Sequence, residues 1–136
     1  MPAPTLAEVR LFVADETGGD LTELTSGGGP VVRFTAPDLQ RAQRSAARLR
    51  AGGGDVAVIL DLAVAVPGDF RAVGDDGTVR YAGTVDGLTG LIADIDSADV
   101  ADGVALIPAA GLPRQDLRRL GHDVLGRLAM RGRASA

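Results

Sequence analysis

The stretch Val56-Ala-Val-Ile-Leu-Asp-Leu-Ala-Val-Ala-Val66 decides the fold class of this chain. Apolar residues fill both alternating positions, and only Asp61 interrupts them. A strand with one face in water alternates apolar and polar side chains, whereas a strand covered on both faces is a nearly continuous apolar run. The stretch therefore predicts a strand buried on both faces, as in a parallel sheet covered by helices or in a barrel.

Further strands and helices alternate around this run. Short apolar and β-branched segments bounded by glycine, proline or aspartate predict strands at 9–14, 31–35, 78–82 and 103–108. Three helices are predicted by apolar residues spaced three and four positions apart. These residues are Leu39, Ala42, Ala46 and Leu49 in the first helix, Val85, Leu88, Leu91, Ile92 and Ile95 in the second, and Leu117, Leu120, Val124, Leu125 and Leu128 in the third.

Capping residues indicate where the helices begin and end. Thr35 is predicted as the N-cap of the first helix, with Pro37 in its first turn and Asp38 at N3, and Gly52-Gly53-Gly54 ends that helix. Thr84 is predicted as the N-cap of the second helix. The third helix follows Leu112-Pro113, and residues 131–136 are predicted to be a frayed tail.

The alternation of strands and helices predicts the architecture. Such a chain forms βαβ units with right-handed crossovers, so we expect a single α/β domain over residues 1–130 with a mainly parallel, five-stranded sheet. An open doubly wound sheet and half of a (β/α)8 barrel both fit, since a whole barrel needs ~250 residues. Half a barrel leaves two strand edges, so a homodimer or a barrel-completing partner is expected to cover them.

Composition excludes several function classes. The 136 residues include no cysteine and no lysine, which excludes thiol chemistry, thiolate metal sites, a P-loop lysine and a Schiff-base lysine. His122 is the only histidine, so no metal site is expected, and it is predicted to be an ordinary surface residue. The net charge of −4 argues against nucleic acid as a partner. No signal sequence or membrane span is recognisable, so we expect a cytoplasmic protein.

Four segments carry a family resemblance: Arg80-Tyr-Ala-Gly-Thr84, Gly87-Leu-x-x-Leu-Ile-Ala-Asp-Ile95, Val100-Ala-Asp-Gly-Val-Ala-Leu-Ile-Pro108, and the leucine-rich pattern of 116–128. Together with the helix and strand upstream, over roughly residues 30–130, they resemble the C-terminal half of luciferase-like flavin-dependent monooxygenases, in the alkanesulfonate-monooxygenase-like branch. The resemblance implies a (β/α)8-type fold, FMN or a deazaflavin at the carboxyl ends of the strands, and oxygen or hydride chemistry. The amino-terminal half of such a barrel, which supplies much of the substrate pocket and the catalytic histidines, is missing from this sequence.

Four residues are candidates for cofactor binding. Gly83 and Thr84 open a helix, so their backbone N–H groups and the hydroxyl can meet a phosphate, and Arg80 lies nearby. The alternative is that Thr84 only caps the helix and that Arg80 points outward. Asp61 is either a functional acid beside a pocket or a structural acceptor that is paired with Arg33 or Arg80, because a buried carboxylate needs a partner.

Two functions from different classes remain open. One is a non-catalytic, accessory protein of luciferase-like fold that pairs with itself or with a partner. The other is a flavin-binding oxidoreductase or monooxygenase fragment or subunit. The sequence identifies no catalytic residue, because no second carboxylate is spaced to form an acid/base pair with Asp61.

Overall fold

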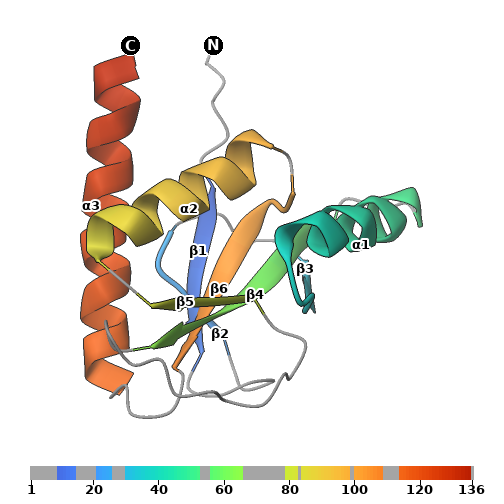
Figure 1. Cartoon of the computed structure of the whole chain (residues 1–136), viewed down its shortest axis with the longest axis horizontal. Helices are drawn as coiled ribbons and strands as arrows, with labels where there is room; N and C mark the ends of the chain where they lie inside the picture. The colour runs from blue at the N-terminus through green and yellow to red at the C-terminus, as the bar shows by residue number, and fades with distance from the viewer. Residues whose placement is uncertain are drawn as a thin grey trace.

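The computed structural model describes residues 9–14, 21–25, 30–52, 56–65, 79–82, 84–98, 100–108 and 114–135. Within these ranges the strands and helices alternate as expected (Figure 1). Their order is β1 (Arg10–Ala14), β2 (Leu21–Glu23), β3 (Val31–Phe34), α1 (Leu39–Ala51), β4 (Ala57–Ala65), β5 (Val79–Ala82), α2 (Val85–Ser97), β6 (Gly103–Pro108) and α3 (Arg114–Ser135).

The strands form one mainly parallel sheet. Its order is β2-β1-β6-β4-β3, and β5 pairs with β4 outside this path. Every ladder is parallel except the one between β1 and β2. The helix α1 connects β3 to β4, and α2 connects β5 to β6, so these two connections are helical crossovers of the kind that parallel strands need. The connection from β4 to β5, which also pair in parallel, lies outside the described residues.

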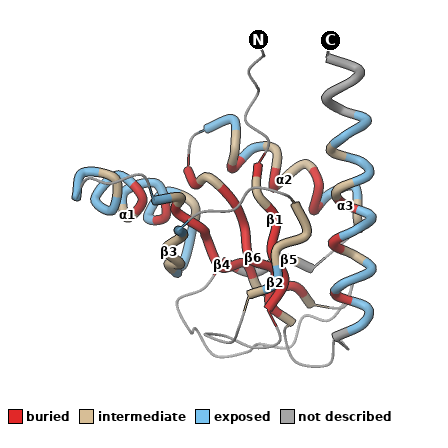
Figure 2. The backbone as a smooth tube through the Cα atoms, turned by 180° about the vertical axis from the view of Figure 1, so that it is seen from behind, coloured by how far each residue is buried: buried red, intermediate tan, exposed pale blue. Residues whose placement is uncertain are grey.

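All three helices cover the same face of the sheet. In the main core, every second residue of the strands packs against the helices, as Leu60 and Leu106 do. The helices contribute their inward-facing residues, such as Ala46, Ile92 and Val124. Figure 1 shows α3 standing along one side, α2 crossing the middle and α1 projecting on the opposite side. In Figure 2 the central strands are buried, and most of the surface of α1 is exposed.

The opposite face of the sheet carries a smaller apolar cluster. Phe12, Ile59 and Ala105 form it, and Leu21, Val31 and Ala57 pack against it. Helices on one face only, with a second apolar face inside the curl of a parallel sheet, are the arrangement of a barrel wall rather than of a doubly wound sheet. The predicted α/β fold, a mainly parallel sheet of βαβ units that resembles half of a (β/α)8 barrel, is confirmed.

One edge of β4 is shared by two strands in succession. Its first part pairs with β3, from Ala57 opposite Val31 to Leu60 opposite Phe34. Its second part pairs with β5, from Leu62 opposite Val79 to Ala65 opposite Ala82. Between them, Asp61 is the residue at which β4 changes neighbours. The long apolar run is thus buried because it is the strand against which three others pair.

The start of the first helix differs from the prediction. The N-cap is Asp38, whose side chain accepts a hydrogen bond of 2.8 Å from the backbone N–H of Arg41, so Thr35 and Pro37 precede the helix. A proline pushes the residue before it out of the helical region, which delays the helix to Asp38. The helix contacts the core through Ala42 and Ala46, while Leu49, predicted to face inward, is 38% exposed.

Two further differences concern short or terminal segments. The sheet has six strands rather than five, because Leu21–Glu23 adds the antiparallel strand β2, which lies in a segment predicted to be a loop. The helix α3 continues to Ser135, whereas a frayed tail was predicted from residue 131. Alanine and arginine have high helix propensities, which favours continuation of the helix over these residues. The glycine-rich turns at 27–29 and 53–54 and the loop at 67–77 lie outside the described residues.

Candidate functional site

Asp61 is the only ionisable residue that is buried in the described part of the chain. It is 3% exposed and lies in the middle of β4, opposite Ala105 of β6. Because side chains alternate along a strand, Asp61 shares its face with Ile59, on the inner side of the curled sheet. A carboxylate in such apolar surroundings is stable only when its oxygens accept hydrogen bonds.

Arg33 of β3 supplies these hydrogen bonds. Its Nε donates to Oδ1 of Asp61 at 3.0 Å, and its Nη2 donates to Oδ2 at 3.2 Å. In the strand register Arg33 lies opposite Ile59, so the guanidinium reaches diagonally to the next residue on the same face. The two bonds form the bidentate geometry for which a guanidinium is suited. The structure pairs Asp61 with Arg33, which is one of the two partners predicted from the sequence.

Burial governs the titration of Asp61. Loss of water around the carboxylate raises its pKa above the ordinary aspartate value, and the hydrogen bonds and the positive charge of Arg33 only partly oppose this effect. Arg33 keeps 19% of its side chain exposed, so its charge is partly screened by solvent, while that of Asp61 is not. The pair is therefore one in which the carboxylate bears most of the cost of burial.

The position of the pair indicates a structural role. Ligands of parallel sheets bind beyond the carboxyl ends of the strands. Asp61 lies four positions before Ala65, the last residue of β4, which is about 13 Å at ~3.3 Å per residue. It lies where β3 stops pairing with β4 and β5 begins, so the ion pair ties β3 to β4 at the point where the two strands separate.

Thr84 is the N-cap of α2, as the sequence predicts. Its hydroxyl oxygen accepts a hydrogen bond of 3.1 Å from the backbone N–H of Gly87. The hydroxyl of Tyr81 donates to the backbone carbonyl of Thr84 at 2.8 Å and packs so close to Gly87 that a Cβ there would lie 2.1 Å from it. Thr84 is exposed, just beyond the carboxyl end of β5.

The described residues fit a flavin phosphate poorly. The first turn of α2 already carries the carboxylate of Asp86, which disfavours a second anion at this helix end. Both oxygens of Asp61 are bound to Arg33, and Asp61 lies well below the edge at which Thr84 is found. The structure therefore does not bring these two candidates together. Gly83 and the side chain of Arg80 lie outside the described residues, although the backbone of Arg80 belongs to β5, opposite Ala63.

Asp102 links three strands and a helix at the amino ends of the strands. Its Oδ2 accepts a hydrogen bond of 2.8 Å from the backbone N–H of Val58, and its Oδ1 accepts one of 3.0 Å from Arg50 of α1. Its own N–H donates to the carbonyl of Val58, and its carbonyl accepts from the N–H of Arg10. The sequence shows Asp102-Gly103 only as part of a family resemblance. In the structure, Asp102 helps to hold β1, β4 and β6 in register.

We expect Asp102→Ala to lower the free energy of unfolding by about 2 kcal/mol, because it leaves the N–H of the fully buried Val58 without an acceptor. Asp102→Asn keeps an oxygen acceptor and should lower it by less. Asp94→Ala is the matched control, since Asp94 is exposed on α2, and its effect should stay within about 0.5 kcal/mol. Urea unfolding of the three variants measures the differences, and equal effects of Asp102→Ala and Asp94→Ala would contradict the assigned role.

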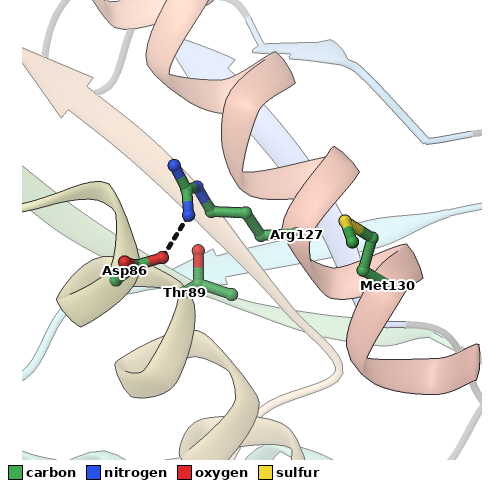
Figure 3. Close-up of a pocket in the computed structure, with 4 residues that line it drawn as sticks. All are labelled: Asp86, Thr89, Arg127 and Met130. Atoms are coloured by element: carbon green, nitrogen blue, oxygen red, sulfur yellow. Dashed lines mark hydrogen bonds and ion pairs between the residues drawn. The ribbon is translucent and has the colours of Figure 1, made fainter. Parts of the chain in front are cut away.

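A shallow groove of about 350 Å³ lies between α2 and α3. Asp86 and Thr89 line it from α2, and Arg127 and Met130 line it from α3 (Figure 3). Arg127 forms an ion pair with Asp86 across the groove, and the Thr89 hydroxyl donates to the carbonyl of Val85 at 2.8 Å. Met130 is 67% exposed, the highest value among the large apolar side chains that the structure describes. Periodicity alone could not reveal this groove, because it depends on how the two helices approach each other.

No group of three or more histidine, cysteine, aspartate or glutamate residues among the described side chains is placed to hold a metal ion. Among the described helices, none has the length and apolar character that a bilayer span requires. His122 is exposed on α3, as predicted.

Comparisons with protein families and with curated proteins found no match.

Proposed function

We propose that the chain is a non-catalytic, accessory protein of luciferase-like fold that acts by pairing with itself or with a partner. The observation that carries this proposal is the position of Asp61 and its hydrogen bonding to Arg33. Both carboxylate oxygens accept hydrogen bonds from Arg33, in the middle of the sheet rather than at the carboxyl ends of its strands. A general acid or base must reach a substrate, and this carboxylate is committed to holding two strands together.

The open form of the sheet supports the pairing part of the proposal. In the described part of the chain, β3 is the last strand at one end of the sheet order and β2 the last at the other. A closed barrel has no such margins. A half-barrel with its helices on one face offers both strand margins and helix surfaces to a neighbouring subunit.

The alternative is a flavin-binding oxidoreductase or monooxygenase fragment or subunit, with FMN or a deazaflavin as the cofactor. The position of Thr84 favours it, since this exposed residue begins a helix at the carboxyl end of a parallel strand, where phosphates of cofactors bind in α/β proteins. A bound flavin would supply redox chemistry there.

A flavin titration and a mass measurement separate the two functions. We expect no change in Tm on addition of FMN or a deazaflavin, and a light-scattering mass above the 13.8 kDa of one chain. Binding at a hundredfold excess over Kd would stabilise the fold by about 2.7 kcal/mol, which is several degrees in Tm. A saturable increase that Thr84→Val abolishes would favour the flavin protein. A single-chain mass at all concentrations would contradict pairing with itself.

A further inference from the structure

Helix α1 carries charge of one sign only. Its residues Leu39–Ala51 include four arginines and no acidic residue, a net charge of +4. The whole chain carries −4, so the chain outside α1 carries −8. Figure 1 shows α1 projecting from one side of the sheet, and in Figure 2 most of its surface is exposed. A positive helix therefore projects from an otherwise acidic molecule.

Three of the arginines form a patch with an apolar neighbour. Arg41, Arg44 and Arg48 are exposed and are spaced three and four residues apart, so they share one side of the helix. This side is turned away from the buried alanines through which α1 contacts the core. Leu49 borders the same side and is 38% exposed. We call these four residues the α1 patch.

The arginines of the α1 patch have few counter-charges. Among the residues that the structure describes, neither Arg44 nor Arg48 forms an ion pair, and Arg41 lies 3.7 Å from Asp38 in a largely exposed pair. Arg44 and Arg48 are four residues apart, a spacing at which like charges repel each other on a helix. A carboxylate brought to this side of α1 finds available donors and relieves that repulsion.

A helix face that is only solvated usually mixes the two signs, as α3 of this chain does. Asp116 precedes Arg119 by three residues, and Asp123 follows it by four. These spacings place opposite charges next to each other along the helix. No acidic residue occupies such a position within α1, and this difference distinguishes the α1 patch from a merely solvated surface.

We infer that the α1 patch binds an acidic helical segment of a partner protein. Along the axis of α1, Arg41, Arg44 and Arg48 follow one another at about 4.5 and about 6 Å, given ~1.5 Å per residue. Carboxylates that are spaced three and four residues apart on a second helix have the same separations, and a guanidinium can bind each of them in bidentate fashion. Leu49 offers an apolar contact beside them. This inference rests on the proposed function and specifies a surface and a kind of partner.

Nucleic acid and a membrane surface fit the α1 patch less well. Both extend beyond the ~20 Å of this helix, so they would also meet the acidic remainder of the molecule. Residues 39–51 include no aromatic side chain on which a base could stack. A helix that lies on a membrane needs a broad apolar face, whereas Leu49 is the only large apolar side chain that is exposed among the described residues of α1.

Fluorescence anisotropy with a labelled synthetic peptide tests the inference on the full-length protein. The peptide is an alanine-rich helix with glutamates spaced three and four residues apart and leucines on the neighbouring row, and its control has glutamine in place of each glutamate. We expect binding of the acidic peptide at low ionic strength, and binding of the control that is weaker by about tenfold or more. Added salt should weaken the binding of the acidic peptide, because exposed charges are screened.

Two double variants with the same change of charge locate the binding site. Arg44→Glu with Arg48→Glu reverses two charges of the α1 patch, and Arg118→Glu with Arg119→Glu reverses two exposed arginines of α3. We expect the first variant to bind the acidic peptide more weakly by about tenfold or more and the second by about twofold at most. Leu49→Ser should weaken the binding by a smaller factor. Far-UV circular dichroism verifies that the variants keep their helices.

Each other outcome has a distinct meaning. Equal losses in the two double variants would overturn the inference, because the total charge rather than the α1 patch would then govern binding. No binding of the peptide by the wild type would also overturn it, while a light-scattering mass above that of one chain would still support the proposed pairing. Duplex DNA, or vesicles that contain phosphatidylglycerol, that bind in place of the peptide and are lost from the α1 variant would replace the protein partner and contradict the inference. A failure of the proposed function appears instead as a rise in Tm with flavin.

Discussion

Replacement of Gly103 by alanine is expected to lower the free energy of unfolding by about 3 kcal/mol. Gly103 begins β6 between β1 and β4. A Cβ at this position would lie 2.5 Å from the backbone oxygen of Arg10, 2.9 Å from its Cβ and 3.0 Å from Cδ1 of Ile59. The oxygen belongs to the ladder between β1 and β6, so the clash cannot be relieved by a change of rotamer. Relief requires that two paired strands move apart.

Gly126 provides the matched control. It lies in α3 with no atom within 4 Å of a Cβ built on it, so Gly126→Ala should raise the free energy of unfolding by roughly 0.5 to 1 kcal/mol through its higher helix propensity. Denaturant unfolding with the slope held common to all variants measures both effects. If Gly103→Ala proved as stable as the wild type, the close approach of β1 and β6 at this residue would be refuted.

The second large effect is expected at the buried ion pair. Asp61→Ala removes both hydrogen-bond acceptors that the Arg33 guanidinium meets and leaves Arg33 largely buried; breaking such a pair costs several kcal/mol, and we expect roughly 3 kcal/mol, because Arg33 retains some contact with solvent. Arg41→Gln breaks the exposed pair between Arg41 and Asp38 and should change the stability by less than about 0.5 kcal/mol. The comparison of the two variants tests whether burial, rather than the mere presence of an ion pair, determines how much the pair contributes to stability.

The same pair makes a prediction about pH. The folded state raises the pKa of Asp61, so it binds a proton more readily than the unfolded chain does. The stability advantage of the wild type over Asp61→Ala should therefore grow as the pH falls from above the folded pKa towards the ordinary value of 3.8, and level off below it. Urea unfolding of both proteins at a series of pH values measures this difference. An advantage that shrinks on acidification would show that Arg33 lowers the pKa instead.

Most of the fold follows from the spacing of apolar residues. The buried run of β4, the strand at 103–108 and the helix capped by Thr84 appear in the structure as predicted, since each combines a clear period with a strong boundary residue. The strand β2 could not be predicted, because its three residues, Leu-Thr-Glu, acquire a strand conformation only by pairing with β1. The exposure of Leu49 depends on how α1 rests on the sheet through two alanines, which periodicity does not specify.

The candidate site was predictable only in part. A lone carboxylate in an apolar run has to be paired, and this requirement alone placed Arg33 among its two candidate partners. The choice between the partners depends on strand register, which the sequence does not encode locally. The contribution of Asp102 to the sheet was not foreseen, because its hydrogen bond to the backbone of Val58 joins segments that are distant in the chain.

The pairing of β1 with β6 has a consequence for how the protein is made. Residue 10 pairs with residue 103, so β1 needs a partner strand that is made 93 residues later in the chain. Until β6 emerges, β2 is the only strand in the described part of the chain that can pair with β1. Such long-range parallel pairing slows folding and leaves an apolar strand uncovered during synthesis. The nascent chain should therefore depend on chaperones until β6 has been translated.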